Sequence, residues 1–127
     1  MGRRWISMGA YLLAAAVMAG AFGAHGLKQR LAPEEMAIYE KAVWYHFVHA
    51  AAVCFVGLLG ETNVLAQRRT SGLAAVFLAG IAFFSGSLYA LALSGVKVLG
   101  AITPIGGVLF IVGWLSLGRT VGKESSR

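Results

Sequence analysis

The stretch TSGLAAVFLAGIAFFSGSLYALALSGV, residues 70–96, contains 27 consecutive residues without a formal charge. A helix needs about 20 apolar residues to cross a hydrocarbon core about 30 Å thick. Three further uncharged stretches, 5–27, 42–60 and 98–118, contain 23, 19 and 21 residues. A soluble bundle would keep a charged stripe on each helix, and these stretches have none. We therefore predict an all-α, four-helix transmembrane bundle, a single domain over 1–127 with spans at about 5–27, 42–60, 70–94 and 98–118.

The composition supports a membrane protein. Hydrophobic residues make up 58% of the chain and charged residues 13%, with a mean hydropathy of +0.74. The net charge of +6 sits at the ends of the apolar stretches, where anionic lipid headgroups explain it, so we expect no nucleic-acid partner. Arg3 and Arg4 before an apolar run also suggest a signal peptide. Because this run continues to Leu27, we expect a retained span instead.

The distribution of basic residues predicts the orientation. With four crossings, the two termini and the 61–69 loop share one side, which carries seven basic residues against four on the other side. The positive-inside rule then places both termini in the cytoplasm of a bacterial inner membrane. On the opposite side, Pro33 followed by Glu34 and Glu35 is typical of a helix start. We therefore expect the second helix to begin outside the bilayer and to run inward without interruption.

Small residues recur along the third span. Spacings of three and four predict one smooth stripe where a neighbouring backbone can approach closely, formed by Gly72, Ala75, Ala79, Ala82, Gly86 and Ala90. Similar patterns occur in span one, at Ala16, Gly20 and Ala24, and in span four, where Gly106 and Gly113 are seven residues apart. The bundle should be tightly packed, and the same stripes could support a homo-oligomer.

A few polar side chains within the spans are expected at a common depth near the outer leaflet. They are His25, Tyr45, His49, Ser85, Ser87, Tyr89 and Thr103. A neutral imidazole in the membrane must satisfy one donor and one acceptor. We therefore expect His49 to bond to the hydroxyls of span three. Two interpretations stay open: a packing network that ties the helices together, or a pocket for a lipid-like or quinone-like ligand.

Alternative chemistries find less support in the sequence. Haem ligation would require His25 to face His49 or His46, because the latter two lie on one helix. The chain has no Asp, and its five Glu lie at or outside the span ends, which disfavours an ion-coupled carrier. No acidic residue is placed to orient a Ser–His pair for catalysis. We expect no metal site and no cofactor.

Pro104 precedes Gly106 and Gly107 near the start of the fourth span. A proline inside a helix leaves the carbonyl four residues earlier without its donor and clashes with it, so we expect a kink at these residues. The alternative is a helix that begins late, with the proline in its first turn.

Three strings, GAFGAHGL at 20–27, FSGSLY at 84–89 and TPIGG at 103–107, resemble those of the YgdD/YwdK-like family of small bacterial inner-membrane proteins. Tyr45 and His49 match the Tyr-x-x-x-His pattern of that family, whereas His46 does not belong to it. The resemblance implies a four-span membrane protein without an established activity, and it marks the same polar residues.

Together these observations predict a non-enzymatic membrane protein with membrane lipids as partners. Its polar cluster would stabilise the bundle or bind a lipid-like or quinone-like ligand. The alternatives are a small transporter or channel that acts as a homodimer and, third, a haem-binding membrane protein.

Overall fold

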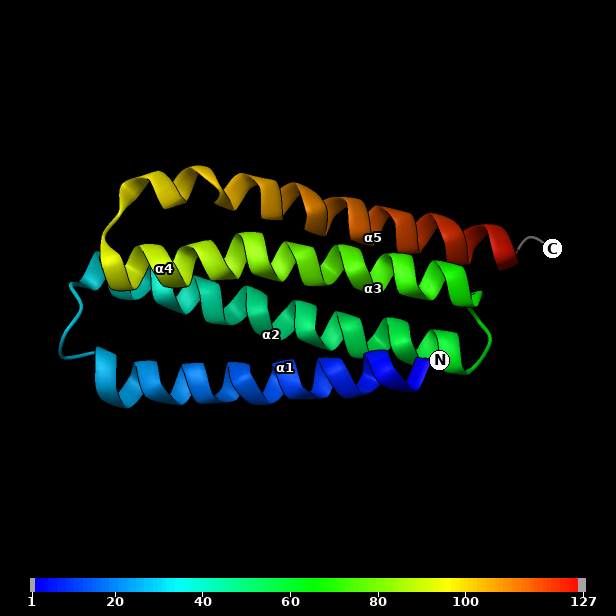
Figure 1. Ribbon diagram of the computed structural model, residues 1–127, viewed down its shortest axis with the longest axis horizontal. Coiled ribbons are helices and arrows are strands. Elements are labelled where there is room, and N and C mark those ends of the chain that lie inside the picture. Colours follow the sequence, from blue (N-terminus) through cyan, green and yellow to red (C-terminus); the bar gives the residue numbers. More distant parts are fainter. Residues whose placement is uncertain (1, 126–127) are drawn as a thin grey trace.

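The computed structural model describes residues 2–125 as four long antiparallel helices, with both described ends on the same side (Figure 1). No strand occurs in this part of the chain. The helical segments are α1 (Gly2–Phe22), η1 (Gly23–Leu27, a π-helix), α2 (Pro33–Glu61), α3 (Gln67–Ile81), η2 (Ala82–Gly86, a π-helix), α4 (Ser87–Ser94), η3 (Lys97–Ala101, a 3₁₀-helix) and α5 (Thr103–Ser125). The predicted all-α bundle is confirmed.

Within residues 2–125, four helices are long and apolar enough to cross a membrane: Gly2–Leu27, Pro33–Glu61, Gln67–Ser94 and Lys97–Lys123. Each contains one of the uncharged stretches, apart from the last two residues of 70–96. The side on which the termini lie stays a prediction, and Arg127, which counts toward the charge bias, lies outside the described residues.

The second helix begins where the sequence predicted. Pro33 is its first residue, and the Glu35 carboxylate accepts a hydrogen bond from the Ala32 backbone N–H at 3.3 Å. The helix then runs unbroken to Glu61, so it starts well before the uncharged stretch 42–60.

Helix α2 is central to the bundle and contacts α1, α3 and α4. Half of its most apolar window is buried, against 17% for the first and fourth spans. Ala50, Val53 and Val56 of α2 pack in one core with Phe77 and Phe110. Lipid tails are as apolar as these side chains, so close packing and hydrogen bonds must hold the helices together.

The α1–α2 contact uses small residues spaced by seven, since Gly2, Gly9, Ala16 and Gly23 are the buried positions of the first span apart from Leu27. A side chain at Gly57 of α2 would place its Cβ 2.8 Å from both the Gly2 oxygen and the Ile6 nitrogen. The two backbones are therefore too close for any larger residue there.

The small-residue stripe of the third span does not pack inside the bundle, contrary to our expectation. Gly72, Ala75, Ala82, Gly86 and Ala90 are exposed, and Ala79 is half-buried. A Cβ at Gly72 would meet no atom within 4 Å. The buried face is formed instead by larger residues such as Phe77, whose ring packs against the buried Gly113 of α5.

Pro104 lies in the first turn of α5, because a 3₁₀-helix ends at Ala101 and the α-helix begins at Thr103. The predicted interior kink at Pro104, Gly106 and Gly107 is therefore wrong, and the late-starting helix is the arrangement observed. A proline here removes only an N–H that has no helical partner in any case. Gly106 serves close approach instead, because a Cβ there would overlap the backbone of Phe84.

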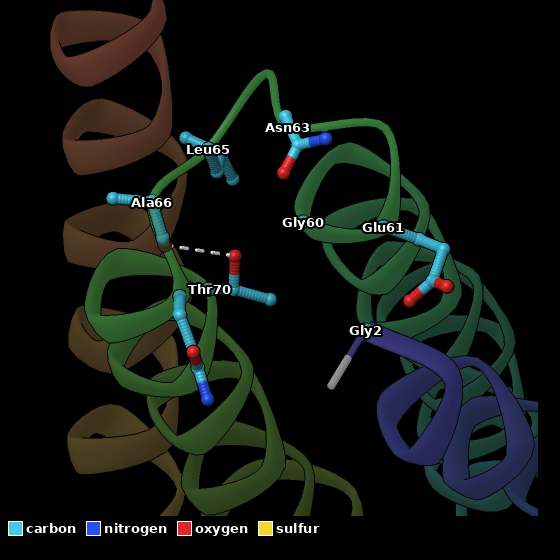
Figure 2. A pocket seen from close by; sticks show the side chains of 8 residues that line it. Gly2, Gly60, Glu61, Asn63, Leu65, Ala66 and Thr70 are labelled. Carbon is cyan, nitrogen blue, oxygen red and sulfur yellow. Dashed lines mark hydrogen bonds between the residues drawn. The ribbon is translucent and has the colours of Figure 1, made fainter.

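Two residues with positive φ form the tight connections. Gly95, with φ of 74°, ends α4 before the fourth span, and Asn63, with φ of 62°, lies between α2 and α3. In the second connection the buried Leu65 anchors the loop, and the Thr70 hydroxyl donates to the Ala66 carbonyl at 3.0 Å (Figure 2).

Candidate functional site

His49 is buried on α2 and has a hydrogen-bond partner at each ring nitrogen. The indole N–H of Trp114 on α5 donates to Nε2 at 3.0 Å. Because indole can only donate, Nε2 is the acceptor and Nδ1 carries the proton of the neutral ring. Nδ1 then donates to the backbone carbonyl of Tyr45, one turn earlier, at 2.9 Å. The imidazole is fully satisfied without a ligand.

Aromatic rings enclose this imidazole. Phe110 of α5 stacks on it, with ring centroids 3.4 Å apart and planes 11° apart. Phe77 and Trp114 lie 5.9 Å from it, and the Trp114 ring also packs on Phe77 at 4.9 Å. His49 thus joins α2 to α5 through a hydrogen bond and a ring stack.

The predicted partners of His49 were wrong. It makes no hydrogen bond to the hydroxyls of Ser85, Ser87 or Tyr89. Its side-chain partner is Trp114, which the sequence does not single out as a site residue. Trp114 is 11 residues beyond Thr103, which is roughly 16 Å along the helix. His49 therefore lies much deeper than Thr103. The signal that could have found Trp114 is its N–H, one of few donors on an otherwise apolar helix.

His46, which the family pattern gave no role, is buried and makes an interhelical bond. Its Nδ1 lies 2.9 Å from the hydroxyl of Tyr89 on α4. Its Nε2 is buried and makes no hydrogen bond of normal geometry with the described residues. Tyr89 also meets the ring of Tyr39 edge-on at 5.4 Å, and the Tyr39 hydroxyl donates to the Ala19 carbonyl of α1.

Two serines bind across other helix pairs. Ser85, fully buried within η2, donates to the Ala42 carbonyl of α2 at 2.8 Å. The hydroxyl of Ser87 lies 2.6 Å from that of Thr103, where α4 meets the start of α5. Ser87 also donates to the Phe84 carbonyl one turn earlier, at 2.9 Å.

The structure does not bring His25 to these residues. His25 is exposed within η1 and has no hydrogen-bond partner among the described residues. The physical reason is the seven-residue packing pattern of span one, which turns Gly23 toward α2. A side chain two positions later points to a different face. The Tyr45 side chain is 37% exposed and contacts the ring of Phe84, so Tyr45 contributes mainly its carbonyl.

These contacts define the polar network of the bundle. It consists of Tyr39, His46, His49, Ser85, Ser87, Tyr89, Thr103 and Trp114, together with the carbonyls of Ala19, Ala42 and Tyr45. Its bonds connect α1 to α2, α2 to η2, α2 to α4, α2 to α5, and α4 to α5. The pairing of His25 with His46 or His49 that haem would require is not formed, since His25 lies on the outer surface. No group of three potential metal ligands occurs among the described residues.

A separate pocket of about 320 Å³ opens at the end that carries the start of α1 (Figure 2). Gly2, Gly60 and Glu61 form one side of it and Thr70 the other. The Glu61 carboxylate lies 3.4 Å from the Arg3 side chain. This pocket could not be predicted from the sequence, because it depends on how three helix ends meet.

Comparison with known proteins identifies similar sequences. The profile of a family described as "Protein of unknown function (DUF423)" matches residues 19–107. A UPF0382 membrane protein of Staphylococcus epidermidis is 50% identical over 89% of this chain and 90% of its own length. The UPF0382 membrane protein YwdK of Bacillus subtilis is 39% identical over 89% of this chain and 91% of its own. No solved structure matches.

Proposed function

Because this chain belongs to the DUF423 family of UPF0382 membrane proteins, whose function is unknown, we propose that it is a non-enzymatic membrane protein whose polar network holds the bundle rigid. We place it in the bacterial inner membrane with both termini in the cytoplasm, as its charge distribution favours.

The observation that carries this proposal is the pairing of His49. Its two nitrogens are bonded within the protein, to Tyr45 and Trp114, so neither is free to bind a ligand. Ser85 and Tyr89 are likewise bonded to other helices. A ligand site would need donors or acceptors directed into a cavity, and these side chains face protein atoms. Between the two interpretations left open by the sequence, the stabilising one is favoured over a quinone-like ligand.

The test compares His49→Ala with His25→Ala. The first variant removes one hydrogen bond within α2, and one hydrogen bond and a ring stack between α2 and α5. The second changes an exposed histidine whose side chain has no partner among the described residues. We expect a clear fall in thermal stability in detergent for His49→Ala and no change for His25→Ala. Co-purified small molecules should be the same in both, by native mass spectrometry. Loss of a bound molecule from His49→Ala would favour a ligand site.

A second candidate is a small transporter or channel that acts as a homodimer. The observation that favours self-association is the outward-facing stripe of small residues on the third span, where Gly72 and Gly86 leave room for a second backbone. Disulfide crosslinking of cysteines placed at Ala75 and Ala82 would detect such a dimer, with cysteine at the buried Ala74 as the control.

A further inference from the structure

A groove of about 660 Å³ lies between the start of α3 and the end of α5, away from the polar network. Figure 1 shows these two segments side by side at the end that carries both termini. Arg68 and Arg69 line its end at the start of α3, which we call its mouth, and Gly72, Val76, Ser116 and Thr120 are among its other lining residues. The groove is therefore basic at one end, hydroxyl-bearing along α5 and apolar further in.

Arg68 and Arg69 determine the charge of the groove. Both are exposed, and neither has an ion-pair partner among the described residues. Their neighbours at this end are already engaged: Arg3 pairs with Glu61 at 3.4 Å, and the Arg4 guanidinium lies 4.8 Å above the Trp5 ring. Positive charge thus gathers at the mouth of the groove, with no carboxylate among its described lining residues.

The length of the groove along α3 also suits a lipid. The rise from Arg68 to Val76 is about 12 Å, which matches the path from a headgroup into the upper acyl chains. Gly72 keeps this path open, because a Cβ there would meet no atom within 4 Å. The pocket of Figure 2 fits an anion less well, since its described lining includes Glu61 but no arginine or lysine.

We propose that one anionic phospholipid binds in this groove, with its phosphate at Arg68 and Arg69 and its acyl chain along Gly72 and Val76. Ser116 and Thr120 supply hydroxyls beside the headgroup and glycerol region. Charge complementarity identifies the occupant, because anionic lipids are enriched on the side of the membrane that receives basic loops. The site is independent of the polar network, which lies between other helix surfaces.

The experiment is native mass spectrometry of the detergent-solubilised protein titrated with phosphatidylglycerol or with phosphatidylcholine of the same acyl chains. One basic residue near a charged membrane surface corresponds to about fivefold in affinity, so Arg68→Gln/Arg69→Gln should weaken phosphatidylglycerol binding about 30-fold. Gly72→Leu fills the groove without a clash in the fold, and it should also abolish the preference for phosphatidylglycerol.

Matched controls distinguish lipid binding in this groove from general electrostatic attraction of anionic lipid to the basic end of the protein. Arg4→Gln/Arg119→Gln removes the same charge from the same end, outside this groove. Gly118→Leu fills open space on α5 away from it. Both controls should keep the phosphatidylglycerol preference, with melting temperatures confirming that every variant is folded. Equal loss in Arg4→Gln/Arg119→Gln, or unchanged binding in Gly72→Leu, would overturn the proposal.

Discussion

Replacing Trp114 with Phe isolates the hydrogen bond that joins α5 to α2. The change removes the indole N–H that donates to His49 Nε2 at 3.0 Å but keeps an aromatic ring beside Phe77. His49 Nε2 then loses its donor inside the bundle. Hydrogen bonds between membrane helices contribute about 0.6 kcal/mol on average and about 1.7 at most, and leaving a buried acceptor unpaired costs about 1–3 kcal/mol. We expect Trp114→Phe to lower the free energy of unfolding by about 1–2 kcal/mol.

The assay is reversible unfolding in mixed micelles by titration with a denaturing detergent, applied to a double-mutant cycle with His49→Phe. The single His49→Phe variant also loses the bond to the Tyr45 carbonyl, but that loss cancels in the cycle. The coupling energy between His49 and Trp114 should be about 1 kcal/mol.

The control is Trp44→Phe, because the Trp44 side chain is 65% exposed and makes no hydrogen bond in the described structure. It should change the unfolding free energy by less than about 0.5 kcal/mol. A coupling energy near zero, or an equal loss of unfolding free energy in Trp44→Phe, would refute the conclusion that this hydrogen bond is a main stabilising contact between α2 and α5.

Three further predictions concern the packing of the bundle and its orientation in the membrane. Gly106→Ala should destabilise the protein by about 2 kcal/mol, because the added Cβ would overlap the Phe84 backbone. Gly72→Ala should be neutral or stabilising by up to about 1 kcal/mol. Thermal melts in detergent compare the two variants. Tyr89→Phe removes the hydrogen-bond partner of His46 Nδ1 and should lower the free energy of unfolding by about 1 kcal/mol in the same titration. Tyr11→Phe changes an exposed side chain and should leave the free energy of unfolding unchanged. Reporter fusions active only in the periplasm should be inactive at both ends of the chain and active when inserted at Gly95; activity at either end would contradict the predicted orientation.

The polar network shows how far residue type alone can identify a site. Ser85, Ser87, Tyr89, Thr103 and His49 all make hydrogen bonds between helices or within a helix turn, as polar side chains in membrane spans must. Their grouping into one cluster around His49 was wrong. His49 bonds to a deeper tryptophan, and His46 takes the place beside Tyr89.

The sequence by itself determined the number of spans, the all-α class and the start of the second helix. These features depend on local quantities: the length of each uncharged run, and the chemistry of Pro33, Glu34 and Glu35 at a helix start. The position of Pro104 stayed ambiguous for the same reason, since a proline fits both a kink and a first turn.

Only the tertiary structure decided which side chains meet. The pairing of His49 with Trp114 depends on how far α2 is shifted along α5 and on how each helix is rotated. Close backbone contacts fix the offsets between neighbouring helices, at Gly57 between α2 and α1 and at Gly106 between α5 and η2. In the packing that results, His25 and the stripe at Gly72 face outward. The π-helical turns at Gly23–Leu27 and Ala82–Gly86 change the rotation further. Most side chains on every face of these helices are apolar, so hydrophobicity alone does not distinguish the packed face. The fit between helix backbones determines it.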